Sequence, residues 1–478
     1  MAIVSALFTD FYSLTMAQGY WKMNIGRRAV FEMFYRRNPF GGGFSVFAGL
    51  QTLLDKLTEF HFLPEDIDYL RSLKFFDTAF LDYLKDFQFT GTLWAQNEGN
   101  IIFPQEPLIR VEGSLIECQL IEGLVLNIIN FQSLIATKAA RVFLAADKGA
   151  IMEFGLRRAQ GPDGALGASR AAFIGGAVGT SNVEAGKLFG IKVMGTMAHS
   201  WIMAFPTEEE AFRAYAAMYP EHPVFLIDTY DTLRSGIVNA IKIGAEISKN
   251  GGGFGVRLDS GDIHYLSCEV RKRLDSAGFP NATIAVSNDL DEEIITALVD
   301  DKTPVNSWGV GTRMVTGTGE ASFPGVYKLA AREDGGGQLI PVMKLSDNPE
   351  KTTTPGIKQV WRLKDKNALA LADVIAFTDE IFEKDALYTF YHPQADYRHF
   401  RALLETEPEP LLKKQLCAGK QITPVLPLAE IRGRCINELD SFDPSYKRIL
   451  NPHIYKVSIS ERMRKLKLQL IQHHLGDV

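Results

Sequence analysis

Polar and charged side chains recur where short apolar runs end, between residues 151 and 315 of the chain. Six such runs begin near residues 151, 192, 224, 255, 283 and 305, and a helical pattern follows them. In a parallel β/α barrel the carboxyl ends of all strands open onto one face, where catalytic groups gather. The pattern therefore predicts that a histidine, a glutamate, several aspartates, two arginines and a glycine-rich loop meet at one site.

Arg257 and Asp259 lie at the end of the fourth run. A guanidinium suits a planar carboxylate or phosphate, and a carboxylate suits sugar hydroxyls or a metal ion. The alternative is an Arg–Asp ion pair that closes the end of the barrel. Residues 260–262 follow with no apolar side chain to bury, so ligand binding is the favoured interpretation.

A glycine-containing turn, Gly309 to Thr312, follows the last run. Barrels commonly bind phosphate late in the array, through backbone N–H groups that a ligand can approach closely beside glycine. A tight turn alone would also explain two glycines. Arg257 and Asp259, two strands earlier, favour the phosphate site.

His199 stands at the end of the second run. A single histidine is often a structural residue, but this one is in line with the other polar strand ends, which favours a functional role. It could act as a general base, a metal ligand or a phosphoryl acceptor, and the residue pattern does not choose among these roles.

Basic residues beyond the strand ends could add positive charge to the same face. Arg157 and Arg158 follow the first run, and Lys344, Lys351 and Lys358 lie in the loop beyond the last one. For any single lysine, a solvated basic edge is the alternative.

The spacing of the runs, roughly thirty residues, fits β/α units. An open doubly wound sheet is the rival architecture, and it would gather ligands at one switch point rather than at every strand end. The flanking segments carry other patterns: helices at 9–21 and 44–57, a strand at 29–35, hairpins at 91–111, a long helical pattern at 116–148, a β run at 359–363 and a basic amphipathic helix at 460–473. The N-terminal part is therefore an α+β region rather than a βα repeat.

Length and composition exclude several classes of protein. A chain of 478 residues with 46% apolar and 23% charged residues is long enough for two or three globular domains. A net charge of −6 gives no reason to expect nucleic-acid or membrane-surface partners. The four cysteines form no CxxC pair, and the N-terminus lacks a basic segment before an apolar one, so we expect a cytoplasmic protein without a signal peptide.

Short strings at these positions resemble the motifs of the nicotinate phosphoribosyltransferase family. They follow the family order over about three quarters of the chain, at residues 9–12, 34–39, 153–158, 179–182, 195–200, 257–262, 286–288, 309–312 and 351–356. The resemblance implies an α/β fold: an irregular β/α barrel with a discontinuous α+β domain built from N- and C-terminal segments. We expect an N-terminal domain at 1–130, the barrel at 131–345, and a segment at 346–478 that completes the α+β domain and packs on the barrel.

The family condenses nicotinate with 5-phosphoribosyl 1-pyrophosphate to form nicotinate mononucleotide and pyrophosphate in NAD salvage. The resemblance therefore implies an ATP-dependent ligase that forms a C–N bond and requires Mg²⁺, whose ligands the sequence leaves unknown. By the same resemblance His199 becomes the phosphoryl acceptor from ATP, and Asp259 binds the ribose hydroxyls.

The resemblance also implies roles in binding nicotinate. Arg257 and Thr196 would hold it, with Arg257 at its carboxylate, and Tyr12 and Phe154 would enclose its ring. Ser181 would donate a hydrogen bond to the carboxylate, because a hydroxyl can donate whereas a carboxylate would repel an acid.

The remaining family residues are expected to bind phosphates. They are Asp10, Arg36, Arg157, Gly311, Thr312 and Lys351. In related enzymes the segment that corresponds to residues 10–12 comes from the partner subunit, which implies a homodimer with shared sites.

Two alternatives remain. Nicotinamide phosphoribosyltransferase resembles the chain at several of these residues, but it typically has an aspartate where Ser181 stands. A non-enzymatic ligand-binding protein on the same scaffold would predict erosion of the polar strand ends, and none is visible. Quinolinate phosphoribosyltransferase is shorter and lacks the coupled histidine.

Overall fold

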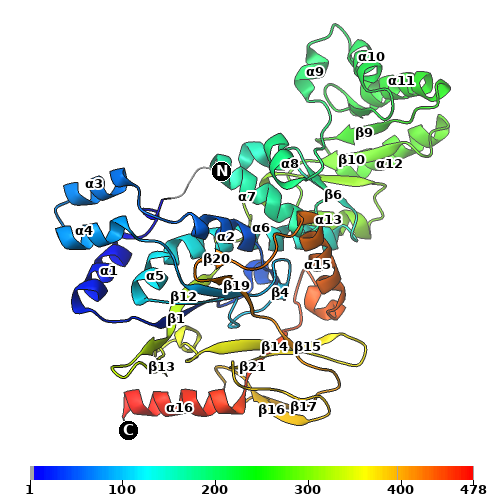
Figure 1. The fold of residues 1–478 in the computed structure, drawn as a ribbon. Coiled ribbons are helices and arrows are strands. Elements are labelled where there is room, and N and C mark those ends of the chain that lie inside the picture. The colour runs from blue at the N-terminus through cyan, green and yellow to red at the C-terminus, as the bar shows by residue number, and fades with distance from the viewer. Residues whose placement is uncertain (1–4, 396, 477–478) are drawn as a thin grey trace. The chain divides into compact units, whose positions relative to one another are not determined.

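The computed structural model describes residues 5–395 and 397–476 of the chain. The chain divides into two compact units (Figure 1). The first unit joins the residues up to Thr137 to those from Ser322 onward, and the second runs from Lys138 to Ala321. The second unit is therefore an insertion between two halves of the first.

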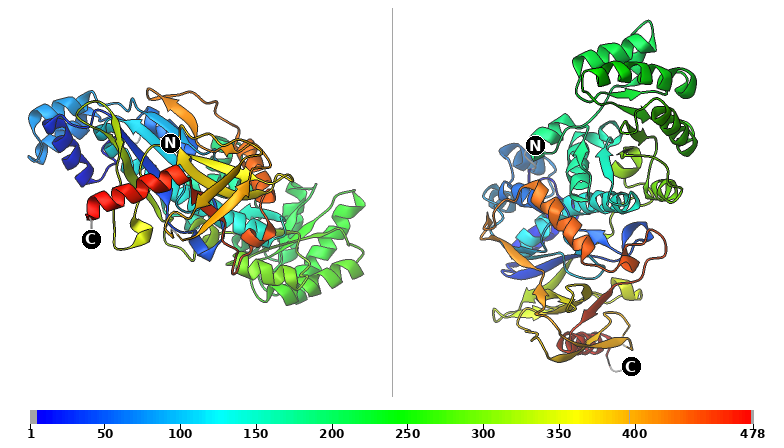
Figure 2. Two further views of the ribbon diagram at one scale, coloured as in Figure 1. Left: turned by 90° about the horizontal axis from the view of Figure 1, so that it is seen from below. Right: turned by 90° about the vertical axis from the view of Figure 1, so that its right-hand side faces the viewer.

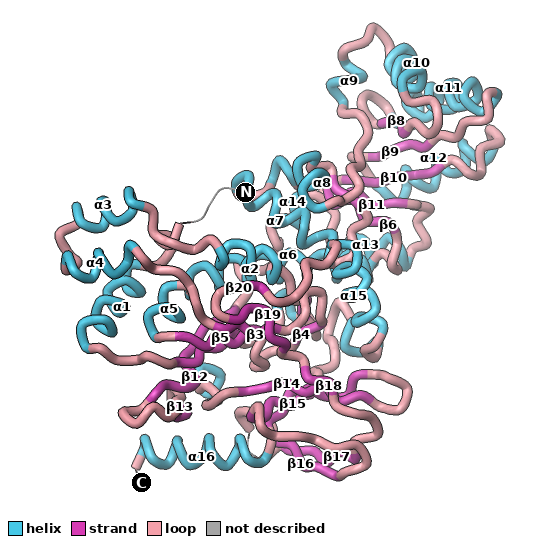
Figure 3. Tube along the Cα trace, viewed as in Figure 1, coloured by secondary structure: helices cyan, strands magenta, loops and turns pink. Residues whose placement is uncertain are grey.

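The second unit contains a parallel six-stranded sheet with the order β7-β6-β11-β10-β9-β8 (Figure 3). Its strands are β6 (Ala150–Glu153), β7 (Gly179–Thr180), β8 (Val224–Leu226), β9 (Gly255–Leu258), β10 (Thr283–Ser287) and β11 (Ser307–Val310). Its helices are α7 (Gly161–Ile174), α8 (Val183–Phe189), α9 (His199–Met203), α10 (Glu208–Met218), α11 (Ile237–Lys249), α12 (Ile263–Ser276), α13 (Glu292–Asp300) and α14 (Thr312–Val315). Strands covered on both faces read as continuous apolar runs, which explains the pattern of the sequence.

The strand order is that of a ring rather than of a doubly wound sheet. Except for β7 and β8, each strand lies beside the next in the chain, and the last strand, β11, pairs with the first, β6. A doubly wound sheet would instead place the first strand beside one from the middle of the chain. A single bridge from Thr180 to Val193 extends the ring beyond β7. Among the described residues no ladder joins Val193 to β8, and we call this gap the seam.

Strands from both ends of the chain build a seven-stranded sheet in the first unit, with the order β13-β12-β1-β5-β3-β19-β20. They are β1 (Ala29–Tyr35), β3 (Thr92–Ala95), β5 (Ile109–Gly113), β12 (Gly325–Glu333), β13 (Leu339–Pro341), β19 (Lys413–Cys417) and β20 (Lys420–Gln421). Because β12 pairs with β1 along its length, residues 322–345 belong to this unit and not to the barrel unit.

Helices of the N-terminal segment pack against this sheet around an apolar core that includes Phe47, Phe60 and Phe80. They are α1 (Phe11–Met23), α2 (Leu50–Thr58), α3 (Pro64–Ser72), α4 (Thr78–Lys85), α5 (Leu115–Leu120) and the first part of α6 (Glu122–Ala145). The short strands β2 (Ser45–Val46) and β4 (Ile101–Ile102) form a separate pair. No helix in the described part of the chain is long and apolar enough to cross a membrane.

The C-terminal segment adds a second sheet, with the order β17-β16-β21-β15-β14-β18. Its strands are β14 (Lys358–Lys364), β15 (Ala370–Phe377), β16 (Leu387–Tyr391), β17 (His399–Leu403), β18 (Glu409–Pro410) and β21 (Lys456–Ile459), with α15 (Leu428–Asp440) between β20 and β21. The last helix, α16 (Glu461–Leu475), lies against this sheet (Figure 2). There Met463 packs with Ile375 and Ile459. The sequence predicted one strand of this sheet, β14, and the helix α16. It did not predict the other strands of the sheet.

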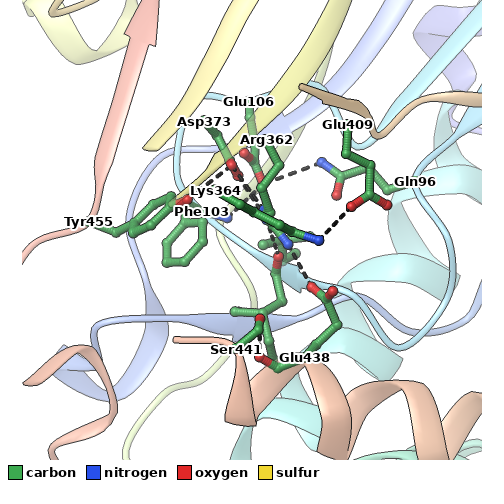
Figure 4. Close-up of polar contacts among 12 residues, drawn as sticks. Gln96, Phe103, Glu106, Arg362, Lys364, Asp373, Glu409, Glu438, Ser441 and Tyr455 are labelled. Carbon is green, nitrogen blue, oxygen red and sulfur yellow. Dashed lines mark hydrogen bonds and ion pairs between the residues drawn. The ribbon is translucent and has the colours of Figure 1, made fainter. Parts of the chain in front are cut away.

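Arg362 joins the two chain segments inside the first unit (Figure 4). Its guanidinium is fully buried and makes two hydrogen bonds to Asp373, at 2.8 and 3.0 Å, and one to Glu438 at 2.6 Å. It also donates to the carbonyl oxygen of Ile101 at 2.8 Å. The Tyr455 hydroxyl donates to Asp373 at 3.1 Å. Strand β14 is thereby fastened both to its own sheet and to β4 of the N-terminal segment.

Glu106 lies beside this network and accepts hydrogen bonds from the Phe103 N–H and from Gln96, at 2.8 and 3.3 Å. Burial raises the pKa of its carboxyl well above the ordinary value, and the negative charge of Asp373 raises it further. The network therefore disfavours a third charged carboxylate beside Asp373 and Glu438.

Arg362→Met is expected to lower the free energy of unfolding by about 3–5 kcal/mol, because it leaves Asp373 buried without its cation. The measurement is urea-induced unfolding followed by circular dichroism. Arg462→Met is the control, since Arg462 pairs with Asp379 on the surface at 2.9 Å and should contribute less than about 1 kcal/mol. Equal losses in the two variants would contradict this account of the buried network.

Candidate active site at the carboxyl ends of the barrel strands

Glu153 ends β6 and fixes the backbone around it rather than facing a ligand. The residue is buried, at 1% exposure. Its carboxylate accepts hydrogen bonds from the Gly155 N–H, from the Ser169 hydroxyl at 2.8 Å and from the Thr180 hydroxyl. The end of β6 is thus tied to α7 and to β7. The expected glutamate of the site is therefore a positioning residue.

Phe154 follows Glu153 and lies over β11. Its N–H donates to the Val310 carbonyl at 2.9 Å, and its side chain is partly exposed. A Cβ atom on Gly309 would lie 2.7 Å from the Phe154 ring and 3.2 Å from Cβ of Ser287. The glycine therefore makes room for the ring, and Phe154 offers an aromatic surface next to β10 and β11.

The turn after β11 carries Gly311 and Thr312, and both are partly exposed. A Cβ on Gly311 would lie 3.1 Å from the Phe154 carbonyl oxygen. Gly309 therefore leaves space for the Phe154 ring, and Gly311 leaves space for the Phe154 backbone. Their proposed contact with a phosphate stays a prediction.

Arg257 projects from β9 and makes a hydrogen bond to the Thr196 hydroxyl. Its Nε atom is buried without a partner, and among the described residues it forms no ion pair with a carboxylate. Burial lowers the pKa of the guanidinium, while Asp259 and Asp228 act in the opposite sense. Arginine remains charged at neutral pH. The ion pair considered as an alternative is therefore not formed, and this partly buried cation has donor capacity for an anion.

Asp259, two residues later, accepts a hydrogen bond from Ser287 of β10 through Oδ1. Its other oxygen, Oδ2, lies 3.8 Å from Nε2 of His199. The second ring nitrogen of His199, Nδ1, lies 3.1 Å from the Thr229 hydroxyl. The His199 side chain is 40% exposed, so Nε2 can be reached from solvent on the same side as Asp259.

Asp228, at the end of β8, orients the Asp259 segment. Its Oδ2 atom accepts the Asp259 N–H at 2.9 Å and the hydroxyl of Ser260. Its Oδ1 atom is buried and has no hydrogen-bond partner among the described residues. The sequence analysis expected several aspartates at the strand ends and gave this one no separate role. Its hydrogen bonds show that it orients the Asp259 segment.

Backbone strain marks the end of β10. Asn288 and Asp289 have φ angles of 128° and 33°, in the region that side chains other than glycine rarely adopt. Such residues concentrate at functional sites, where the surrounding structure holds them. The segment directly follows Ser287, the partner of Asp259.

Ser181 and Arg157 complete the predicted residues of this unit. The Ser181 N–H donates to the Glu153 carbonyl at 2.9 Å, and its hydroxyl makes no hydrogen bond to a described residue. Arg157 is exposed in a short 3₁₀ turn, Leu156–Arg158. The second unit therefore brings together the strand-end residues of the prediction.

Four predicted residues belong to the first unit. Asp10 precedes α1 and Tyr12 lies on it, where burial and Glu122 raise the pKa of the phenol. Arg36 follows β1 and Lys351 ends a short 3₁₀ turn. Their roles toward a ligand stay predictions.

Lys358 does not belong to a basic face, contrary to what its sequence position suggested. It is buried and forms an ion pair of 2.6 Å with Glu32, so its charge is already balanced.

No group of three or more His, Cys, Asp or Glu side chains that could hold a metal ion occurs among the described residues. Mg²⁺ is usually held by one or two carboxylates together with waters and substrate phosphates, so such a group is not required. Asp259 and Asp228, with its unpartnered oxygen, fit that smaller requirement.

Three family models match the chain. The nicotinate phosphoribosyltransferase (NAPRTase) N-terminal domain matches residues 7–130, the NAPRTase family residues 150–393, and the nicotinate phosphoribosyltransferase C-terminal domain residues 357–467. The nicotinate phosphoribosyltransferase of Bacillus subtilis is 40% identical over 473 residues, which cover 98% of this chain and 95% of that protein. That of Homo sapiens is 35% identical over 524 residues, covering 97% and 96%.

Solved structures agree with the sequence relatives. Human nicotinic acid phosphoribosyltransferase superposes with a TM-score of 0.85 at 32% identity, covering 97% of this chain and 99% of that one. The nicotinate-nucleotide pyrophosphorylase of Pyrococcus furiosus gives 0.69 at 22% identity, covering 91% and 94%, which is a likeness of fold. The resemblance and the fold class inferred from the sequence are confirmed.

Gly309→Ala is expected to destabilise the protein by about 1–3 kcal/mol, because the new methyl group must displace the Phe154 ring. The measurement is the free energy of unfolding in urea. Gly164→Ala serves as the control in the same unit, since its nearest neighbour would be 3.9 Å away and alanine favours a helix. A Gly309→Ala protein as stable as the parent would show that the ring does not depend on this glycine.

Proposed function

The chain belongs to the nicotinate phosphoribosyltransferase family, and we propose that it condenses nicotinate with 5-phosphoribosyl 1-pyrophosphate to form nicotinate mononucleotide and pyrophosphate. The relatives that match nearly its whole length are named for this activity. The observation that carries the proposal within the structure is Arg257, a partly buried cation whose buried Nε donor is unused and which has no carboxylate partner among the described residues. It provides a site for the carboxylate of nicotinate.

Nicotinate is held between an aromatic surface and this cation. Its ring stacks on Phe154, and its carboxylate accepts hydrogen bonds from Arg257 and from Ser181, whose hydroxyl has no other described partner. Thr196 orients Arg257 through their mutual hydrogen bond. A hydroxyl at position 181 favours the acid over the amide, because a carboxylate at this position would repel nicotinate.

Phosphoribosyl pyrophosphate lies on the neighbouring strand ends. Asp259 accepts hydrogen bonds from the ribose hydroxyls, and the Gly311–Thr312 turn binds the 5′-phosphate. Ser287 donates to the Asp259 carboxylate and Asp228 accepts the Asp259 backbone N–H, so both hold this residue in place before substrate arrives. Mg²⁺, when bound, would offset the charge of the pyrophosphate, with Asp259 and Asp228 as the carboxylates at hand.

The reaction exchanges one bond at the anomeric carbon for another. The lone pair of the pyridine nitrogen forms the C–N bond while the C–O bond to pyrophosphate breaks, and pyrophosphate leaves with that electron pair. The sugar develops oxocarbenium character, which the fixed Asp259 carboxylate stabilises. Stacking and the Arg257 ion pair align the nitrogen with the anomeric carbon, which lowers the entropic part of the barrier.

We further propose that ATP phosphorylates His199. Thr229 occupies the Nδ1 side of the ring, which leaves Nε2 as the nitrogen that accepts the phosphoryl group. A phosphoryl group on Nε2 would stand close to Asp259, at present 3.8 Å away, and the like charges would repel each other. Phosphorylation would thereby shift the segment that carries His199 relative to Asp259, and this shift would couple ATP to substrate affinity.

A homodimer with shared sites is also part of the proposal. Tyr12 is 47% exposed on α1, although an aromatic side chain normally buries most of its surface. In the dimer, Tyr12 of the partner subunit would cover the face of nicotinate opposite Phe154, and Asp10 and Arg36 of the partner subunit would approach the phosphates. Arg157 and Lys351 supply the remaining positive charge. The four free cysteines agree with a cytoplasmic location.

The purified chain is expected to form nicotinate mononucleotide from nicotinate and phosphoribosyl pyrophosphate with Mg²⁺, and ATP should increase the rate. The measurement is product formation by chromatography, with nicotinamide as the competing substrate. Preference for nicotinamide would reverse the assignment of Ser181, and absence of either product would remove the enzymatic proposal in favour of ligand binding alone.

His199→Ala is expected to abolish both the phosphoprotein and the stimulation by ATP, while slower transfer without ATP continues, because the binding residues for both substrates remain. Labelled ATP followed by a product assay measures the two effects together. His222→Ala is the control, since His222 lies at the opposite end of β8 from Asp228. ATP stimulation that survives in His199→Ala would refute the role given to this histidine.

A further inference from the structure

Helix α16 carries a lysine on the same face as its buried methionine. Met463 and Lys467 are the buried residues of the helix, and Ile471, which is partly buried, and Leu475, which is exposed, continue the same four-residue spacing. Met463 is fully buried, and Lys467 is only 7% exposed. Burial of an ammonium group is costly unless a partner balances its charge. The position would therefore be expected to hold an apolar residue, and the lysine requires an explanation.

The ammonium group of Lys467 has less than its full set of partners. It donates one hydrogen bond of 2.6 Å, to the carbonyl oxygen of Pro393. An ammonium has three donors, and no described carboxylate forms an ion pair with this one. The nearby cation Lys358 is already paired with Glu32. Burial, and to a smaller degree Lys358, lowers the pKa of Lys467 to about 8.

Lys467 lines a cavity of about 700 Å³ in the first unit. This size is typical of a small-molecule site. Leu468, Ile471 and Leu475 supply an apolar wall from α16, and residues 344–352 form the wall opposite. Among the described lining residues, Lys344 and Arg464 are basic and Asp347 is acidic.

We propose that this cavity binds an amphiphilic monocarboxylate, with the carboxylate paired to the Lys467 ammonium and the hydrocarbon tail against the apolar wall of α16. Lys467 is the buried cation of the described lining, and the donors that it does not use toward Pro393 suit one carboxylate. An occupant would contact the 344–352 segment, which carries Lys351. The site lies within the first unit and shares no residue with the strand ends of the second.

Octanoate binding to the full-length protein, measured by isothermal titration calorimetry, tests this proposal. Lys467→Met keeps the length of the side chain and removes its charge, and it is expected to weaken binding at least about tenfold. Lys465→Met is the matched control, because Lys465 lies on the exposed face of α16 in a 2.9 Å pair with Glu461 and should leave the affinity unchanged. Acetate and 1-octanol, which carry the charge or the tail alone, should each bind at least about tenfold more weakly than octanoate.

A second variant separates binding from folding. Ile471→Trp fills the tail region without altering any charge, and it should also weaken octanoate binding while circular dichroism stays unchanged. No binding of octanoate to the parent protein, or equal affinity in the parent and a folded Lys467→Met variant, overturns the proposal. Product formation is measured separately, so failure of this site leaves the catalytic proposal untouched.

The pH dependence of binding identifies the cation. Octanoate stays charged at neutral and alkaline pH, whereas Lys467 loses its proton as the pH rises through about 8. Affinity should be full below that pH and should fall above it. The other ionisable groups around Lys467 are His392, Lys344, Asp347, Lys358 and Arg464. We expect the Lys467→Met variant to lose this pH dependence of octanoate affinity. If the variant still lost affinity as the pH rises, one of the other groups would be the cause.

Discussion

Parallel pairing between β6 and β11 joins the first and last strands of the second unit, and the candidate site depends on it. Because the ladder is parallel, the carboxyl ends of both strands lie at the same edge, which puts Glu153 level with Val310. Phe154 can then rest on Gly309, and the glycine turn lies directly beneath it. Had the same strands formed a doubly wound sheet, the first and last would not be neighbours. The aromatic surface and the glycine turn would then lie on different parts of the sheet.

The first unit is built from two segments that are separated by almost two hundred residues in the chain. Apolar packing brings them together, but apolar contacts tolerate many arrangements. Arg362 restricts the choice, because its donors must meet Asp373, Glu438 and the Ile101 carbonyl at once. A shifted register would leave a buried charge unpaired, which costs several kcal/mol. The main effect of this network is therefore to favour one arrangement of the two segments over others. Its net contribution to the free energy of unfolding is the smaller effect.

The limits of sequence interpretation are visible in particular residues. The short apolar runs of β9 and β10 were predicted because a covered parallel strand has a distinct composition. The strand β7 was missed, because two residues are too few to show a periodic pattern. The strand expected near residue 192 forms only a single bridge at Val193. Glu153 was expected at a strand end and ends β6, but the expectation that Lys358 adds to a basic face was wrong, and the partners of neither residue were foreseeable. The Lys358–Glu32 pair joins residues more than three hundred positions apart, and no local pattern encodes such a contact.

Thr196 and His199 lie in the segment next to the seam, between Val193 and β8. Backbone hydrogen bonds hold this segment to the sheet along one edge, through the bridge to Thr180, whereas β9, β10 and β11 are held along both. No complete ladder therefore holds this segment. Arg257 and Asp259, by contrast, belong to β9 or directly follow it. The ring thus holds its site residues unequally: backbone ladders along both edges fix the strand that carries Arg257, whereas one edge alone holds the segment that carries Thr196 and His199.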